Sequence, residues 1–254
     1  MKVAIITGAT SGIGWEAAIQ IDRRFTSLDE IWIIGRREEK LLELQKKLRH
    51  SVRTLAMDVT DERDMKEFAK LLCKLNPNVR MLFQSAGMGL HGKFAELSAE
   101  DQTAMIRLNC EALTHFTSVC LKYMRRGSHI VNVASSAGFM PFPGYSVYGA
   151  SKAYVLNFSR ALRAELKPRH INVLAVCPGP VNTPFFDVSE RYGTGISPFK
   201  KAVMNKPEVV VRRALGDAAL KKSVSVDGPH IGLFRLIIKI LPKTPIVDII
   251  SKIL

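Results

Sequence analysis

A glycine-rich turn near the amino terminus constrains the fold of this chain more than any other feature. Residues 3–6 form a short apolar run typical of a buried strand, and an apolar pattern with helical spacing begins at Trp15. Residues 7–14, between them, read Thr-Gly-Ala-Thr-Ser-Gly-Ile-Gly. A strand, a glycine-rich turn and a helix in this order are typical of a dinucleotide-binding unit. A glycine-rich loop without a ligand is the alternative.

The glycines of this turn have separate predicted roles. Gly8 permits the tight turn, Gly12 lets the backbone approach a pyrophosphate, and Gly14 lets the helix pack closely on the strand. The helix amino terminus then presents free N–H groups to the phosphates. The residues of the turn expected to contact the cofactor are Gly8, Thr10, Ser11, Gly12, Ile13 and Gly14.

The end of the second predicted strand, residues 31–34, favours NADP over NAD. NAD-binding sites usually carry an acidic residue here, which binds the ribose 2′-hydroxyl. This chain has Gly35 followed by Arg36 and Arg37. An arginine fork suits a 2′-phosphate, and we expect Arg36 to contact it. The alternative is that both arginines begin a solvated helix over 37–49.

A Tyr-x-x-x-Lys pair, Tyr148 and Lys152, lies in a helix predicted over 147–167. Residues four apart share a helix face, so a phenol and an ammonium point the same way. A nearby cation lowers the pKa of a tyrosine, which suits proton transfer near neutral pH. Ser135 follows the apolar run 130–134, at a strand end where open α/β sheets bind ligands. The pair alone occurs by chance in many helices, and the glycine turn makes a catalytic role more credible.

Apolar strands and amphipathic helices alternate along the chain. Strands are predicted near 2–6, 31–34, 53–57, 80–84, 129–134, 171–176 and 223–226. Helices are predicted over 12–24, 37–49, 61–75, 98–124, 147–167 and 207–221. This alternation predicts an α/β fold: one Rossmann-type domain with a doubly wound parallel sheet flanked by helices. We place the catalytic domain at 1–229, with a substrate loop over 184–205, and an apolar, basic, helical tail at 230–254.

Together these motifs resemble the compact form of the short-chain dehydrogenase/reductase family, over residues 2–183. The resemblance implies that Asp58 and Val59 contact the adenine, and that Ala86 and Gly87 approach the cofactor. It implies a catalytic tetrad of Asn109, Ser135, Tyr148 and Lys152, of which Tyr148 and Lys152 also contact the cofactor. A turn that closes over the nicotinamide is implied at Pro178, Gly179, Val181 and Thr183.

Two departures from the family pattern concern the cofactor site. Gln84 and Ser85 replace the family's two asparagines before Ala86 and Gly87, which puts local hydrogen bonding in question. Ser11 stands where many NADP-using relatives have a basic residue, so the expectation of NADP depends on Arg36.

The resemblance implies an NADP-dependent oxidoreductase that interconverts a ketone and a secondary alcohol. Tyr148 is expected to act as general acid and Ser135 to stabilise the substrate oxygen. Lys152 is expected to lower the pKa of Tyr148 and hold the nicotinamide ribose, and Asn109 to anchor a water that relays protons. A non-catalytic cofactor-binding regulator and a peripheral membrane scaffold are the alternatives.

The substrate is expected to be hydrophobic. Phe139, Phe142 and Tyr145 lie between Ser135 and Tyr148, and Phe185 begins the substrate loop. The tail repeats apolar residues at helical spacing, and it could cover the pocket, pack between subunits or lie on a membrane. A tail of this type resembles a subgroup with 3-oxoacyl reductases and hydroxysteroid dehydrogenases.

Composition sets the remaining expectations. The net charge is +14, and residues 189–254 hold twelve Lys and Arg against five Asp and Glu. An anionic substrate, an acidic carrier protein or a membrane surface fits this charge better than nucleic acid, since no aromatic platform accompanies it. The four cysteines lie far apart and are interpreted as buried thiols in the cytoplasm. No metal-binding spacing occurs, and the family resemblance implies a homodimer or homotetramer.

Overall fold

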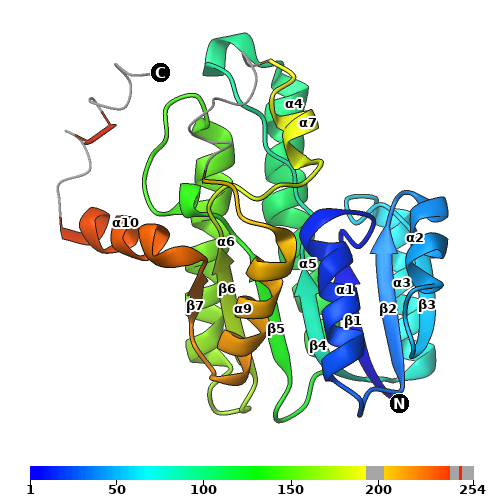
Figure 1. Ribbon diagram of the computed structural model, residues 1–254. Coiled ribbons are helices and arrows are strands. Elements are labelled where there is room, and N and C mark those ends of the chain that lie inside the picture. The colour runs from blue at the N-terminus through cyan, green and yellow to red at the C-terminus, as the bar shows by residue number, and fades with distance from the viewer. Residues whose placement is uncertain (193–202, 241–245, 248–254) are drawn as a thin grey trace.

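Seven strands form one parallel sheet in the computed structural model, which describes residues 1–192, 203–240 and 246–247 (Figure 1). The strands are β1 (Lys2–Thr7), β2 (Glu30–Gly35), β3 (Ser51–Ala56), β4 (Asn78–Gln84), β5 (His129–Val133), β6 (Asn172–Cys177) and β7 (Val224–Val226). Their order in the sheet is β3-β2-β1-β4-β5-β6-β7. The direction of winding therefore reverses between β1 and β4. Open α/β sheets bind ligands at the carboxyl ends of the strands at such a point.

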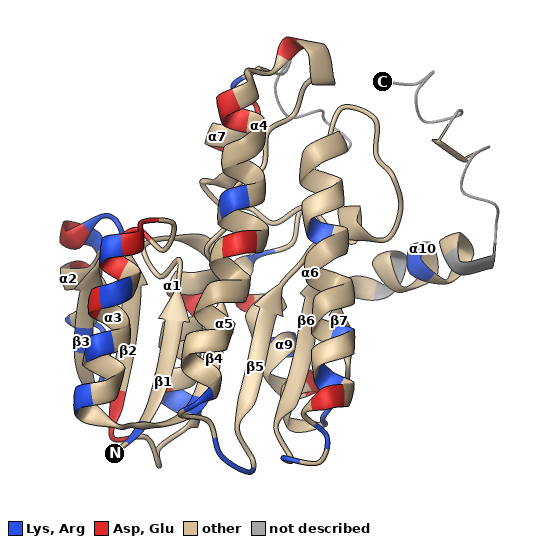
Figure 2. Cartoon of the chain, turned by 180° about the vertical axis from the view of Figure 1, so that it is seen from behind, with Lys and Arg blue, Asp and Glu red and all other residues tan. Residues whose placement is uncertain are grey.

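Helices cover both faces of the sheet, as the alternation of strands and helices predicts. They are α1 (Gly12–Arg24), α2 (Glu38–Gln45), α3 (Glu62–Leu75), α4 (Ala99–Ile106), α5 (Leu113–Leu121), α6 (Ser146–Glu165), α7 (Phe185–Ser189), α9 (Pro207–Ala219) and α10 (Gly228–Ile240). Helices α1, α2 and α9 pack on one face, and α3, α5 and α6 on the other (Figures 1 and 2). The predicted doubly wound, Rossmann-type fold is confirmed.

The apolar residues of β1 show how one strand supplies both cores. Successive side chains of a strand point to opposite faces. Ala4 and Ile6 accordingly pack beneath α1 and α9, while Val3 and Ile5 pack beneath α3 and α5. All four are fully buried. A continuous apolar run is therefore what a central parallel strand requires.

Helix α3 illustrates the local signals that set helix boundaries. The Asp61 side chain accepts hydrogen bonds from the main-chain N–H of Arg63 and Asp64, and so caps the first turn. Asn76 ends the helix in the left-handed conformation, at φ 42°. Acidic and basic residues are frequent along α2 and α3 (Figure 2), while Met65, Phe68 and Leu72 of α3 are buried.

Three expectations need correction. The single helix predicted over 98–124 contains a π-helical segment, Arg107–Ala112, between α4 and α5. The helix predicted over 37–49 ends at Gln45. Cys73 is exposed, because it lies on the outer side of α3, whereas Cys110, Cys120 and Cys177 are buried as predicted.

Candidate active site

The glycine turn brings main-chain atoms into direct contact. A Cβ on Gly14 would lie 2.2 Å from the Gly8 carbonyl oxygen, so α1 packs on the turn only because residue 14 is glycine. A Cβ on Gly8, at φ +67°, would lie 2.7 Å from the Ala86 nitrogen. Thr7 Oγ1 accepts a hydrogen bond from that same N–H, at 3.2 Å. The turn therefore rests on the segment after β4, at the point where the winding reverses.

The start of α1 faces a second loop that is distant in sequence. Helix α1 begins at Gly12, which has φ +55°. A Cβ there would lie 3.0 Å from Thr183 Cγ2. The free N–H groups of the first turn of α1 and the end of the 178–183 turn thus border one cradle. Its glycines leave the backbone accessible, as close binding of a pyrophosphate requires.

The two arginines after β2 have different partners. Arg36 Nη1 lies 3.7 Å from Asp58 Oδ2, and the Arg36 side chain is 77% exposed. Arg37 Nη2 donates to Thr10 Oγ1 at 2.9 Å and to the Thr10 carbonyl at 3.2 Å. The Arg36 guanidinium is thus largely exposed, with Asp58 as an ion-pair partner. Arg37 stands at the start of α2, as the alternative interpretation held, and its hydrogen bonds to Thr10, which sequence reasoning missed, steady the glycine turn.

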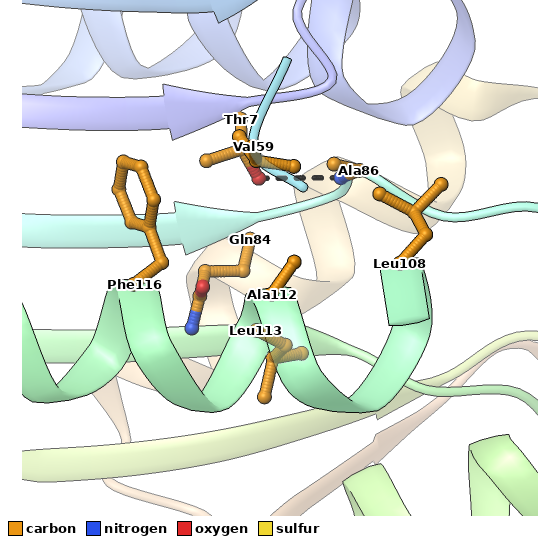
Figure 3. Close-up of a pocket in the computed structure, with 8 residues that line it drawn as sticks. All are labelled: Thr7, Val59, Gln84, Ala86, Leu108, Ala112, Leu113 and Phe116. Carbon is orange, nitrogen blue, oxygen red and sulfur yellow. Dashed lines mark hydrogen bonds between the residues drawn. The ribbon is translucent and has the colours of Figure 1, made fainter. Parts of the chain in front are cut away.

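Asp58 is held as a carboxylate. Partial burial raises its pKa, but hydrogen bonds from the Thr60 hydroxyl and N–H, together with the charge of Arg36, hold the pKa below its usual value. Its neighbour Val59 is buried. A cavity of about 10 Å³, room for roughly one water molecule, lies behind this site. Figure 3 shows the lining residues Thr7, Val59, Gln84, Ala86, Leu108, Ala112, Leu113 and Phe116.

The catalytic candidates Ser135, Tyr148 and Lys152 come together at the carboxyl end of β5. Ser135 Oγ accepts from the Ala137 N–H at 3.1 Å. Lys152 is buried, and its Nζ donates to the Val133 carbonyl at 2.9 Å. That Nζ also lies 5.8 Å from the centroid of the Tyr148 ring. The helix spacing thus places phenol and ammonium on one face of α6, as predicted.

The electrostatics differ from the sequence expectation. Burial raises the pKa of Tyr148 to about 12, although a hydrogen bond with the Ser135 side chain lowers it. Burial lowers the pKa of Lys152 to about 8. The expectation that Lys152 depresses the Tyr148 pKa is therefore not met in this arrangement. Desolvation outweighs an ammonium that is already hydrogen-bonded to a main-chain carbonyl.

Asn109 lies in the π-helical segment, a conformation found frequently at functional sites. Its Nδ2 donates to the Met88 carbonyl at 2.8 Å and to Ser151 Oγ at 2.9 Å, and its Oδ1 accepts from the Met88 N–H at 3.0 Å. Ser151 in turn donates to the Tyr148 carbonyl. A Cβ on Gly87 would lie 3.1 Å from Asn109 Oδ1 and 3.3 Å from Lys152 Nζ. Asn109 and Lys152, two of the four residues of the predicted tetrad, therefore both lie beside Gly87.

Gln84, which stands where the family usually has an asparagine, forms buried side-chain hydrogen bonds. Its Nε2 donates to Thr117 Oγ1 at 2.8 Å and to Asn132 Oδ1 at 3.0 Å. Asn132 Nδ2 donates to Ser159 Oγ at 3.0 Å. This buried network joins α5, β4, β5 and α6. The departure at Gln84 is therefore accommodated with its hydrogen bonds made.

The predicted nicotinamide turn is tied down at several points. The Pro178 carbonyl accepts from the Ser136 N–H at 2.8 Å, and the Gly179 N–H donates to Asp227 Oδ1 at 2.7 Å. Val181 forms a parallel bridge with Asn205, whose side chain donates to Asp227 Oδ2 at 2.6 Å. Asp227 and Asn205 were missed from sequence, because neither belongs to a recognised motif.

Of the four predicted substrate residues, two lie beside the Tyr148 ring. The Tyr145 and Phe185 ring centroids lie 5.8 and 5.7 Å from that of Tyr148. Phe139 instead packs beneath α10, where the Arg235 guanidinium lies 5.9 Å from its ring centroid. Phe142 is half-buried, and its carbonyl accepts from the Tyr145 N–H. Residues 193–202 of the predicted loop 184–205 lie outside the described residues.

Comparisons with known proteins agree with this geometry. The model of the family "short chain dehydrogenase" matches residues 2–191. The NADP-dependent 3-hydroxy acid dehydrogenase YdfG of Escherichia coli is 35% identical, over 89% of this chain and 92% of that protein.

Two solved structures are similar over nearly the whole chain. A short-chain dehydrogenase from Sphingobium yanoikuyae in complex with NADPH is 26% identical, with a TM-score of 0.77, covering 96% of this chain and 98% of the other. The actinorhodin polyketide ketoreductase with NADPH is 28% identical, with a TM-score of 0.75, covering 91% and 97%. The family match and the assembled Ser-Tyr-Lys site show that this chain belongs to the short-chain dehydrogenase family, as an oxidoreductase that acts on hydroxyl or carbonyl groups.

Proposed function

We propose that this protein is an NADP-dependent reductase of a ketone on a hydrophobic substrate, of oxoacyl or steroid type. The observation that carries the proposal is the position of the Tyr148 phenol. Its hydroxyl is hydrogen-bonded with Ser135, its ring lies near Lys152, and the rings of Tyr145 and Phe185 are its aromatic neighbours. A proton donor is thus set at the edge of an aromatic wall.

The residues of the cradle fit NADP. Gly8, Gly12 and Gly14 leave the space that side chains would otherwise fill, and exposed Arg36 supplies a cation without an acidic residue at position 35. The E. coli relative is named as NADP-dependent, and both similar structures contain NADPH. When bound, the reduced cofactor supplies hydride to the carbonyl carbon.

The chain's own residues supply the proton and the electrostatic stabilisation. Because burial raises its pKa to about 12, Tyr148 is protonated at neutral pH, as a donor to a carbonyl oxygen must be. The Ser135 hydroxyl donates a hydrogen bond to the same oxygen as charge develops on it. Protonated Lys152 stabilises the phenolate that Tyr148 becomes. Both Nδ2 hydrogens of Asn109 are already used, so a water anchored by Asn109 would donate a hydrogen bond to one of its oxygen atoms.

Subunit packing belongs to this proposal as well. Ile106 of α4 and Tyr154 of α6 are large apolar residues that are more than 40% exposed. Tyr154 stacks on Phe158 and shares a hydrogen bond with Thr114 of α5. These neighbouring helices are candidates for the interface of a homodimer or homotetramer. Light scattering of the purified protein would test this.

We propose that α10, the described start of the tail, packs on its own domain rather than on a membrane, while residues 241–245 and 248–254 of the tail lie outside the described residues. Ile231 and Ile238 of α10 are buried, and Ile231 lies against Gly179 of the nicotinamide turn. None of the helices among the described residues is long and apolar enough to span a bilayer.

Turnover of NADPH with 3-oxoacyl thioesters, oxosteroids and small diketones tests the function. We expect one of these classes to be reduced, and Tyr148→Phe to lower kcat by about 100-fold or more while NADPH affinity is nearly unchanged. Ser136→Ala, at a half-buried neighbour of Ser135, is the control and should retain activity. Near-native turnover by Tyr148→Phe would contradict the mechanism.

A further inference from the structure

Three side chains from separate segments meet on the substrate side of Tyr148. His91 follows β4, Tyr145 precedes α6, and Glu190 follows α7. His91 Nδ1 lies 3.0 Å from Glu190 Oε2, and the Tyr145 hydroxyl donates to Glu190 Oε1 at 3.2 Å. The His91 and Tyr145 rings are stacked, with centroids 4.6 Å apart. We call these three residues the clasp.

The clasp is built into the protein rather than formed at its surface. The Glu190 side chain is 8% exposed and that of His91 is 22% exposed. A carboxylate this far from water is stable only where hydrogen bonds and charges compensate its lost hydration. Surface ion pairs such as Lys70–Glu67, with both side chains at least 70% exposed, contribute little by comparison.

Main-chain hydrogen bonds join the same three segments. The His91 N–H donates to the Ser189 carbonyl at 2.7 Å, and the Gly92 N–H donates to the Gly144 carbonyl at 2.9 Å. Gly144 has φ +74°, and a Cβ there would lie 3.1 Å from His91 Nε2. The segments before α6 and after α7 are therefore held against the loop that follows β4.

The position of α7 controls the space beside the catalytic phenol. Phe185, at the start of α7, packs against the Tyr148 ring. A Cβ on Gly89 would lie 2.5 Å from Tyr148 Cδ2 and 2.8 Å from Phe185 Cζ, so these two rings and the Gly89 backbone are in mutual contact. A small displacement of α7 would therefore move Phe185 relative to the proton donor.

We infer that Glu190 is a positioning residue: through His91 and Tyr145 it fixes α7, and with it Phe185, at the distance from Tyr148 that substrate binding requires. The inference rests on the proposed function for its kinetic consequence, but the restraint on α7 is a property of the protein alone. The Glu190 carboxylate binds His91 and Tyr145. It acts through the aromatic wall formed by Tyr145 and Phe185.

The same segment offers a matched control. The Tyr192 hydroxyl donates to Asp101 Oδ2 of α4 at 2.6 Å, and Tyr192 is 39% exposed. Tyr192→Phe removes the hydrogen bond to Asp101, just as Tyr145→Phe removes the one to Glu190. Because Tyr192 is exposed, water can take the place of the lost hydroxyl at Asp101. Figure 1 shows α7 beside α4, where this outer contact is made.

Hydrogen exchange without substrate tests the restraint directly. Exchange of amides 185–191, followed by mass spectrometry, should be about tenfold faster in Glu190→Gln than in the native protein. Tyr192→Phe should leave it within about twofold. Unchanged exchange in Glu190→Gln would overturn the inference, whether or not the protein reduces any carbonyl tested.

Kinetics with a 3-oxoacyl thioester and NADPH test the consequence. Glu190→Gln should raise KM about tenfold, change kcat less and leave the Kd for NADPH unchanged. Tyr145→Phe in the Glu190→Gln background should add little to the effect, because the two residues act as one unit. If Glu190→Gln had a lower melting temperature but the native KM, the clasp would have a structural role only, and the inference would be overturned. Absence of turnover by the native protein would count against the proposed function, while hydrogen exchange would still decide the clasp.

Discussion

The cofactor cradle and the substrate side of this site are held together by different kinds of contact. In the cradle, main chain meets main chain: positions 8 and 14 have no room for a Cβ. On the substrate side, side chains from remote segments meet, such as His91 and Glu190, 99 residues apart. A contact between main chains admits only glycine, so it can be recognised in the sequence. A contact between side chains admits many pairs of residues, so the sequence does not reveal it.

The two regions should accordingly respond differently to substitution. A change in the cradle disturbs the backbone that binds the cofactor, so it should affect both folding and cofactor affinity. A change on the substrate side should affect stability or substrate binding and spare the cofactor. Substitutions in each region test this difference.

Gly14→Ala should have the largest effect. Its Cβ would lie 2.2 Å from a main-chain oxygen that cannot move without distorting the turn, so we expect a loss of about 3 kcal/mol or more in the free energy of unfolding, with weaker NADP binding. Gly216→Ala, in α9 with no atom within 4 Å of the added Cβ, is the control and should stabilise by about 0.5–1 kcal/mol. Urea denaturation measures both. A mild effect of Gly14→Ala would remove the steric argument for the cradle.

Lys152, where the two regions meet, should produce a pH-dependent effect. Burial lowers its pKa from 10.5 to about 8, which disfavours the protonated form of the folded state by roughly 3 kcal/mol. This cost is complete below pH 8, and it disappears as the pH rises to 10.5, because the unfolded state binds more protons in that interval. Lys152→Met should therefore be more stable than the native protein at pH 7, with a difference that shrinks by pH 10.

Denaturant unfolding at both pH values checks this result. Lys70→Met, at an exposed position of α3, is the control for a change of charge alone. A stability difference for Lys152→Met that did not change with pH would contradict the assigned cost of burial.

Alanine substitutions on the buried and exposed sides of α10 should differ by about 2 kcal/mol in their cost to the free energy of unfolding. Ile231 is 8% exposed and packs against Gly179, so Ile231→Ala should cost about 2–3 kcal/mol while NADP binding survives. Leu236 is 56% exposed, and Leu236→Ala should change stability by no more than about 0.5 kcal/mol. Thermal unfolding with and without NADP separates the two effects. Equal costs would mean that the outward side of α10 is also covered.

Arg36→Ala should have the smallest effect on free energy, and this effect should be confined to the binding of NADP. Because Arg36 is exposed, we expect the preference for NADP over NAD to shrink by about 1 kcal/mol, with NAD affinity nearly unchanged. Arg37→Ala should instead weaken both cofactors, since it loses its hydrogen bonds to Thr10. Titrations with each cofactor measure these changes. Equal affinity of the native protein for NADP and NAD would contradict the role of Arg36.

The fold was predictable because each strand carries its own signal. Residues 3–6 and 31–34 are continuous apolar runs, and all of them are buried. Helix boundaries were less predictable where tertiary contacts decide them. The π-helical segment around Asn109 adapts the helix to the Met88 backbone and Ser151, and these partners lie 21 and 42 residues away in the chain.

The site was predictable in part, for the same reason. Tyr148 and Lys152 are one helical turn apart, so their common orientation follows from local geometry. Their pKa values do not, because burial by the whole fold raises one and lowers the other. Asp227, Asn205, His91 and Glu190 carry no local pattern at all, since each acquires its partner only when separate loops meet above the sheet.

The sequence alone determined the parallel α/β sheet, the glycine cradle and the Ser135, Tyr148 and Lys152 site. These depend on steric exclusion at single positions and on the regular periods of strands and helices. Only the tertiary structure decided that Arg37 braces the glycine turn, that Phe139 lies against Arg235 of α10, and that Glu190 joins His91 to Tyr145. Desolvation and pairing between distant side chains depend on how the whole chain packs, and no short segment encodes them.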